Sequence, residues 1–247
     1  MERNQSFEVE GLSSIGVHLA WAQLEIFADD VDKIQVMAAG DDSSVNDLRI
    51  EARENQLLVE QPQYGLSFNI TESRWLQVCV RVPKHFDGRI RLNTISGLLS
   101  ARKLSANEIS LETVSGDLRA LKLTAQALTL KTVSGDARGE EIAAERVSMR
   151  SVSGNIILDA LNAQTLKCNS VSGEQTYNMN GHFQSVEVTA VSGNVIITAP
   201  VEGMNVSLRS ISGRVRTQGV NIIDDETAPS VRITGVSADL KLISIKE

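Results

Sequence analysis

Residues 113–116 read Thr-Val-Ser-Gly, and this short phrase, with small changes, occurs seven times along the middle of the chain. The glycines that end successive copies are 19 or 20 residues apart. A spacing this constant indicates one supersecondary unit stacked on copies of itself. The repeated glycines, which we expect to form structural turns, are Gly97, Gly116, Gly135, Gly154, Gly173, Gly193 and Gly213.

Apolar residues recur at fixed distances before each glycine. In the repeat that ends at Gly116, Ile109 and Leu111 stand seven and five positions before the glycine, and the polar Ser110 lies between them. Alternation with a period of two is typical of a β-strand that buries one face. The Val or Ile two positions before each glycine lies an odd number of positions after these apolar residues, so it does not fit the same alternation. The pattern therefore predicts a corner at the Ser-Gly pair, where glycine supplies backbone freedom.

Each unit is too short to bury its apolar face alone. After the corner, apolar side chains resume at Leu118 and again at Leu123, so one unit holds two or three short strands. We predict an all-β fold, a parallel β-solenoid (β-helix) with rungs of about 19–20 residues that pair at about 4.8 Å. A small β-propeller is the competing architecture, but its blades usually need about forty residues.

The 247 residues are expected to pack as one continuous domain with two parts. Residues 1–89 are strand-like without the repeat, and we expect an irregular β-rich N-terminal cap over the open edge of the solenoid. Residues 90–247 form the repeat β-solenoid, in which an acidic loop at 224–226 precedes a decayed eighth corner at 236–238. No separate cap follows, so pairing with a second copy, as a homodimer, is one way to protect the last rung.

Charge and composition exclude several classes of protein. The formal net charge of −7 argues against a general nucleic-acid or anionic-membrane binder, because a phosphate backbone requires a basic patch. No run approaches the length of a membrane span, and no signal peptide opens the chain. The sequence thus predicts a cytoplasmic location, with the cell surface reached only by a non-standard route. The two cysteines, Cys79 and Cys168, offer no disulfide framework.

The residues give no pattern for catalysis, so we expect that the chain is not an enzyme and has no cofactor. The repeated serine is no nucleophile, because seven equivalent copies lack seven partnered bases. The three histidines, His18, His85 and His182, have no periodic relation to it. Because β-helices include polysaccharide lyases and hydrolases, a carbohydrate-active enzyme is the alternative.

Acidic and amide residues follow the glycines and should stack in one file along a corner. Oxygen ligands on adjacent rungs suit calcium, so Asp117 and Asp136 form a weak candidate metal site. The simpler explanation is that Asp and Asn are turn formers at these positions.

Five residues form a candidate ligand patch. Arg119 and Arg138 lie two positions beyond those aspartates and recur one period apart, as a carbohydrate-facing pair would, although a solvated charge pattern is the simpler explanation. Tyr64, Trp75 and His85 mark the expected junction between cap and solenoid. A role in the core is the simpler explanation for Trp75.

The repeats resemble a family of bacterial proteins described as putative adhesins, domain of unknown function 4097. The resemblance covers roughly residues 15–245 and is carried by Val-Ser-Gly-Asp at 114–117 and 133–136, Val-Ser-Gly-Asn at 152–155 and 191–194, and Val-Arg-Val-Pro at 80–83. It implies a β-helical fold and an adhesin-like or envelope-associated role, and it supplies no catalytic residues.

We therefore expect a non-enzymatic interaction or scaffold module that presents a repetitive β-solenoid surface to a protein or a cell-envelope glycan. A second alternative is a cytoplasmic regulatory partner of an envelope-stress system. The absence of an export signal in the sequence suggests it.

Overall fold

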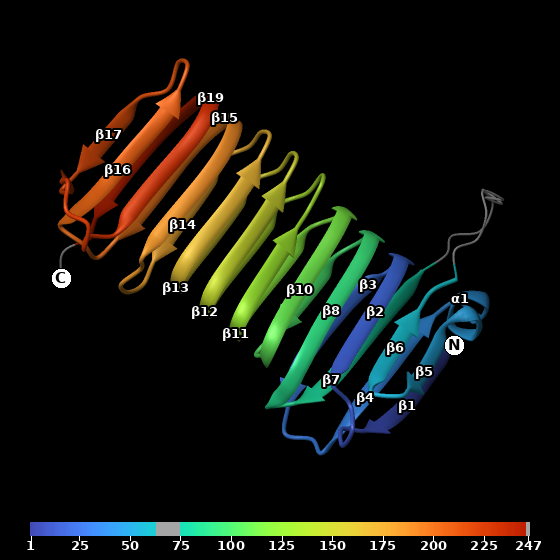
Figure 1. The fold of residues 1–247 in the computed structure, drawn as a ribbon. Coiled ribbons are helices and arrows are strands. Elements are labelled where there is room, and N and C mark those ends of the chain that lie inside the picture. Colours follow the sequence, from blue (N-terminus) through green and yellow to red (C-terminus); the bar gives the residue numbers. More distant parts are fainter. Residues whose placement is uncertain (63–74, 246–247) are drawn as a thin grey trace.

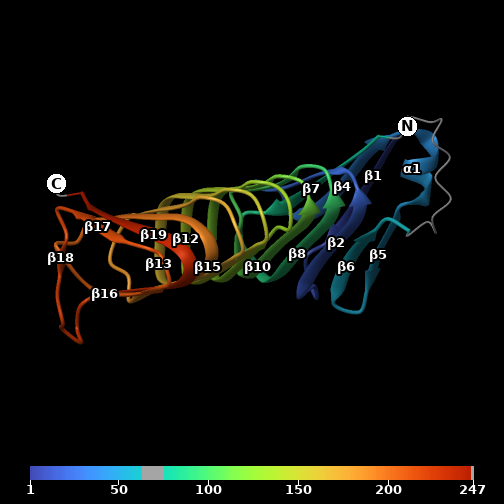
Figure 2. The same ribbon diagram turned by 90° about the horizontal axis from the view of Figure 1, so that it is seen from above.

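The computed structural model describes residues 1–62 and 75–245, and its strands stand side by side in one long stack (Figure 1). Seen from above, the chain coils, with strands on two opposite sides of the stack (Figure 2). The described elements are β-strands, apart from the short helix α1 (Asp42–Asp47). The prediction of an all-β fold is therefore confirmed.

The middle of the stack consists of parallel strand pairs whose partners are 19 or 20 residues apart. Ile109 pairs with Ile90 on one side and with Leu128 on the other, so residues of one sequence column lie next to one another. All three side chains are buried. The strands of this part are β8 (Phe86–Ser96), β9 (Leu99–Arg102), β10 (Ser105–Ser115), β11 (Leu118–Lys131), β12 (Ala137–Ser151), β13 (Ile156–Ser170), β14 (Gln175–Met179) and β15 (Ser185–Ala199).

The N-terminal part is more regular than the irregular cap that we expected. Here β2 and β3 pair in parallel with β8 and β9, while β6 and β7 pair in parallel with β2 and β3. The residues before β8 therefore extend the stack with strands taken out of chain order. Ile15 pairs with Ile90, far outside the repeat spacing. These strands are β2 (Ser14–Trp21), β3 (Gln23–Asp29), β6 (Gln56–Glu60) and β7 (Leu76–Pro83).

Antiparallel strands and α1 close this end of the stack. β4 (Lys33–Gly40) pairs with β7, and β1 (Glu2–Glu8) pairs with β4. β5 (Arg49–Arg53) forms an antiparallel hairpin with β6. The side chain of Asp41 caps α1 by accepting a hydrogen bond from the Ser44 amide at 3.0 Å. Helix α1 has six residues, and no helix in the described ranges is long and apolar enough to cross a bilayer.

The opposite end departs from stacking in chain order. β19 (Ser230–Ser244), which contains the predicted eighth corner, lies between β15 and the pair of β16 (Gly203–Ser210) and β17 (Val215–Gln218). The seventh repeat is therefore outermost, where β16 and β17 are labelled in Figure 1. The short β18 (Asn221–Ile222) pairs only with the first residues of β16.

The corner glycines stack directly on one another. Gly135 has a φ of 145°, in the left-handed region that favours glycine. A Cβ atom at this position would overlap the carbonyl oxygen of Gly116 on the preceding rung, and Gly154 has the same relation to Gly135. Two independent reasons, backbone conformation and close approach, thus require glycine at this corner.

A column of buried Thr and Ser side chains, which we did not predict from the sequence, lies at the first five corners. The residue three positions before the glycine points inward, and Thr94, Thr113 and Thr132 are at most 4% exposed. Thr94 Oγ1 donates a hydrogen bond to the Ser96 carbonyl at 2.8 Å, which satisfies a polar backbone group inside the turn. The parity of the strand thus continues through the Thr or Ser position, and the following Val or Ile points outward.

We expect Gly135→Ala to lower the free energy of unfolding by about 2 kcal/mol more than Gly181→Ala, measured by chemical denaturation. Gly181 is the matched control because its φ of 137° is similar but an added Cβ would find its nearest neighbour, Asn162, at 3.6 Å. The comparison isolates the overlap with Gly116 from backbone strain. Equal losses in the two variants would contradict the close-approach constraint.

Candidate functional site

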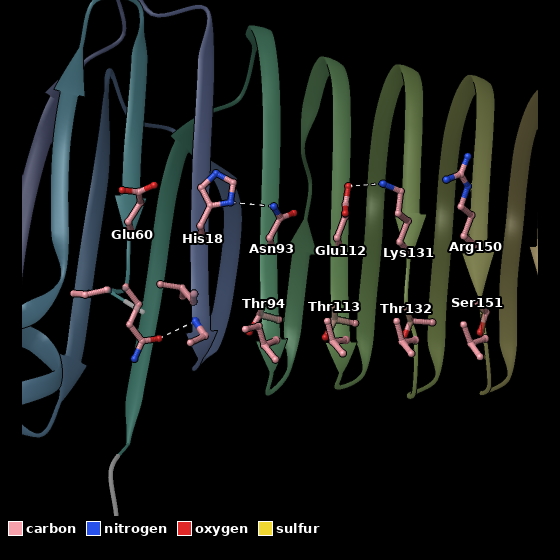
Figure 3. A pocket seen from close by; sticks show the side chains of 18 of the residues that line it. His18, Glu60, Asn93, Thr94, Glu112, Thr113, Lys131, Thr132, Arg150 and Ser151 are labelled. Atoms are coloured by element: carbon pink, nitrogen blue, oxygen red, sulfur yellow. Dashed lines mark hydrogen bonds and ion pairs between the residues drawn. The ribbon is translucent and has the colours of Figure 1, made fainter. Parts of the chain in front are cut away.

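A groove of about 710 Å³ crosses the stack on the side formed by β2, β6, β8, β10 and the second halves of β11 and β12. It runs over six neighbouring strands, from β6 through β2, β8, β10 and β11 to β12, which corresponds to a length of about 24 Å. Figure 3 shows its side chains in rows, one position per rung.

The two walls of the groove differ in chemistry. Four aliphatic side chains of the apolar wall are 41–50% exposed, which is unusual for Val and Ile in such regular order. The apolar wall consists of Ala20 and these four side chains, Ile95, Val114, Val133 and Val152. The polar wall consists of Arg49, Glu60, His18, Asn93, Glu112, Lys131 and Arg150.

Strand geometry explains this arrangement. The residues four and two positions before each corner glycine lie on the same outward face, because side chains alternate along a strand. The Thr or Ser between them points inward, so mainly backbone remains between the two rows. Thr94, Thr113, Thr132 and Ser151 accordingly lie along the floor of the groove (Figure 3).

Hydrogen bonds hold the polar wall in place. Asn93 Nδ2 lies 2.9 Å from His18 Nδ1, and Lys131 Nζ lies 2.8 Å from Glu112 Oε1 (Figure 3). Burial acts to raise the pKa of the Glu112 carboxyl, but the hydrogen bond and charge of Lys131, with the Ser110 hydroxyl, outweigh it and lower that pKa. Arg150 is exposed and forms no ion pair with any described residue.

Gln61 ends the groove beside β2. Its side-chain oxygen accepts hydrogen bonds from the backbone amides of Ala20 at 2.9 Å and Trp21 at 3.2 Å. Gln61 is 6% exposed, and with Pro62 it lines the groove next to β2. The buried side chain of Gln61 thus supplies the hydrogen-bond acceptor that the backbone of a neighbouring strand would otherwise supply to these amides of β2.

Arg119 and Arg138, predicted as part of a ligand patch, lie next to each other on the opposite side of the coil. They pair in register on β11 and β12 and line a second groove of about 720 Å³. Two of its arginines have acidic partners: Arg102 pairs with Glu25, and Arg138 lies 3.9 Å from Asp136. This second groove lacks the continuous aliphatic row of the first.

The other residues of the predicted patch do not join them. Trp75 and His85 lie before and after β7, a strand of eight residues and thus about 26 Å long, so the structure separates them. Trp75 is 55% exposed, which contradicts the core role considered for it. Tyr64 lies outside the described residues.

Asp117 and Asp136 form a hydrogen-bonded ladder along the corner. The Asp136 amide donates to Asp117 Oδ1 at 3.1 Å, and the Asn155 amide donates to Asp136 Oδ1 at 2.9 Å. Asn155 in turn accepts from the Glu174 amide at 3.0 Å. Each side chain thus binds the backbone of the next rung. In the described part of the chain, no group of three or more His, Cys, Asp or Glu side chains could hold a metal ion, and calcium binding here stays a prediction.

The groove was not predicted from the sequence, although two columns of the repeat mark it. The Val or Ile column indicates a corner, but it also forms an exposed apolar row two positions after the column of Asn93, Glu112, Lys131 and Arg150. His18 and Glu60 come from strands outside the repeat, so only their pairing in space brings them to the same wall.

We expect Asp136→Ala to lower the free energy of unfolding by about 1 kcal/mol, because the Asn155 amide loses its acceptor. Asp136→Asn keeps an oxygen in the same place, as Asn155 does naturally, and should retain most of the stability. Chemical denaturation of both variants measures the difference. Equal destabilisation by Ala and Asn would show that the charge, rather than the ladder, is what matters.

We expect the stability difference between the natural chain and Glu112→Gln to depend on pH. The folded-state pKa of Glu112 is lowered, so its stabilising contribution is present above the unfolded pKa and is lost as pH falls through the folded pKa. Denaturation of both chains from neutral to acid pH should show the difference shrinking. A difference that stays constant over this range would contradict the role of the ionised carboxylate.

Comparisons with known proteins agree with this architecture. The chain matches the family Toastrack DUF4097 over residues 12–241, and no curated protein matches it. Similar solved structures include a putative adhesin from Parabacteroides distasonis, with a TM-score of 0.63, 13% identity, and 98% of this chain and 97% of that chain covered. A putative adhesin from Bacteroides fragilis has a TM-score of 0.53 and 16% identity, with coverage of 98% and 97%.

A third solved structure, described as a putative lipid binding protein from Parabacteroides distasonis, has a TM-score of 0.54 and 14% identity, with 97% of this chain and 96% of that chain covered. At these identities the likeness concerns the fold alone. The family match extends over most of the 247 residues. The chain therefore belongs to the Toastrack DUF4097 family.

Proposed function

We propose that this chain is a non-enzymatic interaction module that binds an extended segment of a partner protein along the groove. The observation that carries the proposal is the row of four half-exposed Val and Ile side chains that faces a row of polar side chains on the same four rungs. Solvent-exposed aliphatic rows of this length are otherwise unfavourable and mark interaction surfaces.

The chemistry of the two walls favours a peptide. An extended peptide offers apolar side chains for the aliphatic wall and backbone amides and carbonyls for the polar wall. Arg150 has no ion-pair partner among the described residues, so we infer that an acidic residue of the partner lies at this end of the groove. The similar structures described as putative adhesins are consistent with a binding role.

Other ligand classes fit the groove less well. A glycan commonly stacks on exposed aromatic rings, and the described lining residues of the groove include no Trp, Tyr or Phe. An acyl chain would match the apolar wall. It would also remove water from the charged side chains of the polar wall without offering them hydrogen-bond or ion-pair partners. One similar structure is described as a putative lipid binding protein, so lipid belongs among the ligands to be tested.

The proposal predicts that peptides selected on the immobilised chain from a random library contain apolar residues with an acidic residue near one end. Val133→Asp places a charge in the middle of the aliphatic wall and should weaken these peptides by at least about tenfold, measured by calorimetry. Val133 is 41% exposed, so the substitution should leave the fold intact. Arg150→Glu should shift the selected peptides from acidic to basic.

Val171→Asp is the matched control, because Val171 occupies the same column with 46% exposure but does not line the groove. It should leave peptide binding unchanged. Equal loss in both variants would assign binding to the whole column, and an absence of enriched peptides would overturn the proposal. Binding of phospholipid vesicles or cell-wall glycan that Val133→Asp abolishes would replace the peptide with that ligand.

A further inference from the structure

The β16 end of the stack is built differently from the N-terminal end. At the N-terminal end, antiparallel β1, β4 and β5 and helix α1 cover the rungs. At the other end, β16 and β17 pair with β19 on one side only, and the two-residue β18 covers just the start of β16 (Figures 1 and 2). The last rung thus presents an open sheet edge in the described part of the chain.

The direction of the free backbone groups on β16 follows from its hydrogen bonds. The Asn205 amide donates to the Pro229 carbonyl at 2.9 Å, toward β19, while the Met204 carbonyl accepts from the Ile223 amide at 3.0 Å on the opposite side. Successive residues of a strand direct their backbone groups to alternate sides. Beyond Met204, the amides and carbonyls of Val206 and Leu208 therefore face outward from the stack, where no described strand pairs with them.

The apolar interior is also open at this end. Val206 and Leu208 belong to columns whose members on the adjacent strand β19, Val231 and Ile233, are at most 1% exposed. On β16 the same columns are only partly buried. At the adjoining corner Ile211 is 83% exposed, whereas its counterparts in the other rungs are half-exposed. An unpaired edge beside exposed apolar side chains is a template for strand addition.

Charge divides the last rung into two opposite halves. The Asn205 side chain binds the backbone of Asp225, because Asn205 Oδ1 accepts a hydrogen bond from the Asp225 amide at 3.0 Å. The acidic loop 224–226 therefore lies at the start of β16. Arg209 and Arg214 stand at the end of β16 and just beyond it, and both are exposed. None of these charged side chains forms an ion pair with another described residue.

We propose that two copies of this chain associate end to end by pairing their β16 strands antiparallel about a twofold axis. Antiparallel pairing places the start of one β16 beside the end of the other, so each acidic loop faces the arginines of the partner copy. The charge pattern is thus self-complementary, which is what an isologous interface requires. The pairing joins the outward backbone groups of Val206 and Leu208 and covers Ile211.

The test is sedimentation equilibrium of the full chain together with four variants. The natural chain should be a dimer whose dissociation constant increases with salt. Ile211→Asp should weaken the dimer by about tenfold or more, because it buries an unpaired charge, whereas Val171→Asp, in the same column away from this end, should not. Circular dichroism of each variant checks that the fold is retained.

A charge exchange makes the test specific for antiparallel pairing. Arg209→Glu combined with Arg214→Glu should weaken the dimer by about tenfold. Adding Asp224→Arg and Glu226→Arg to that double variant should restore it. A chain that remains monomeric at high protein concentration would overturn the proposal, and so would a dimer that none of the changes at 209, 211 and 214 weakens.

Discussion

The close approach of stacked glycines is the constraint on which the rest of the structure depends. Because the carbonyl of Gly116 occupies the space where a side chain of Gly135 would begin, each corner must sit directly upon the preceding one. This contact fixes the register of every column in the rung, including the buried Leu columns and the inward Thr column. A shift by one residue would turn all of these side chains to the opposite face.

Two polar ladders reinforce the same corner from opposite sides. The hydroxyls of Thr94, Thr132 and Ser170 donate to carbonyls of their own corners from within. The Asp and Asn side chains bind amides of the next rung from without. The first ladder acts inside one rung and the second acts between rungs. The outward Val or Ile lies between them, which places an apolar row on a surface that would otherwise be polar.

Much of this fold follows from the sequence, and the limits have physical reasons. The 19-residue period and the parity of columns such as Ile109 and Leu111 suffice to predict an all-β chain with a glycine corner. Pairings such as that of Ile15 with Ile90 leave no periodic trace, because each is made once and over a long separation. The same applies to His18 and Glu60, so the complete polar wall of the groove could not be predicted. The separation of Trp75 from His85 could have been predicted, since an extended strand lies between them.

The placement of β19 has a consequence for the order in which the chain can fold. In the middle of the stack, a rung finds its partner as soon as the next 19 or 20 residues are present, so structure can propagate between neighbours. Val186 of β15 instead pairs with Val231 of β19, and Val206 of β16 pairs with the same residue on the other side. Until residues 230–244 are available, two rungs have no partner on that side. Completion of this end therefore depends on one long-range strand pairing, which is slower than the pairing of successive rungs in the middle of the stack.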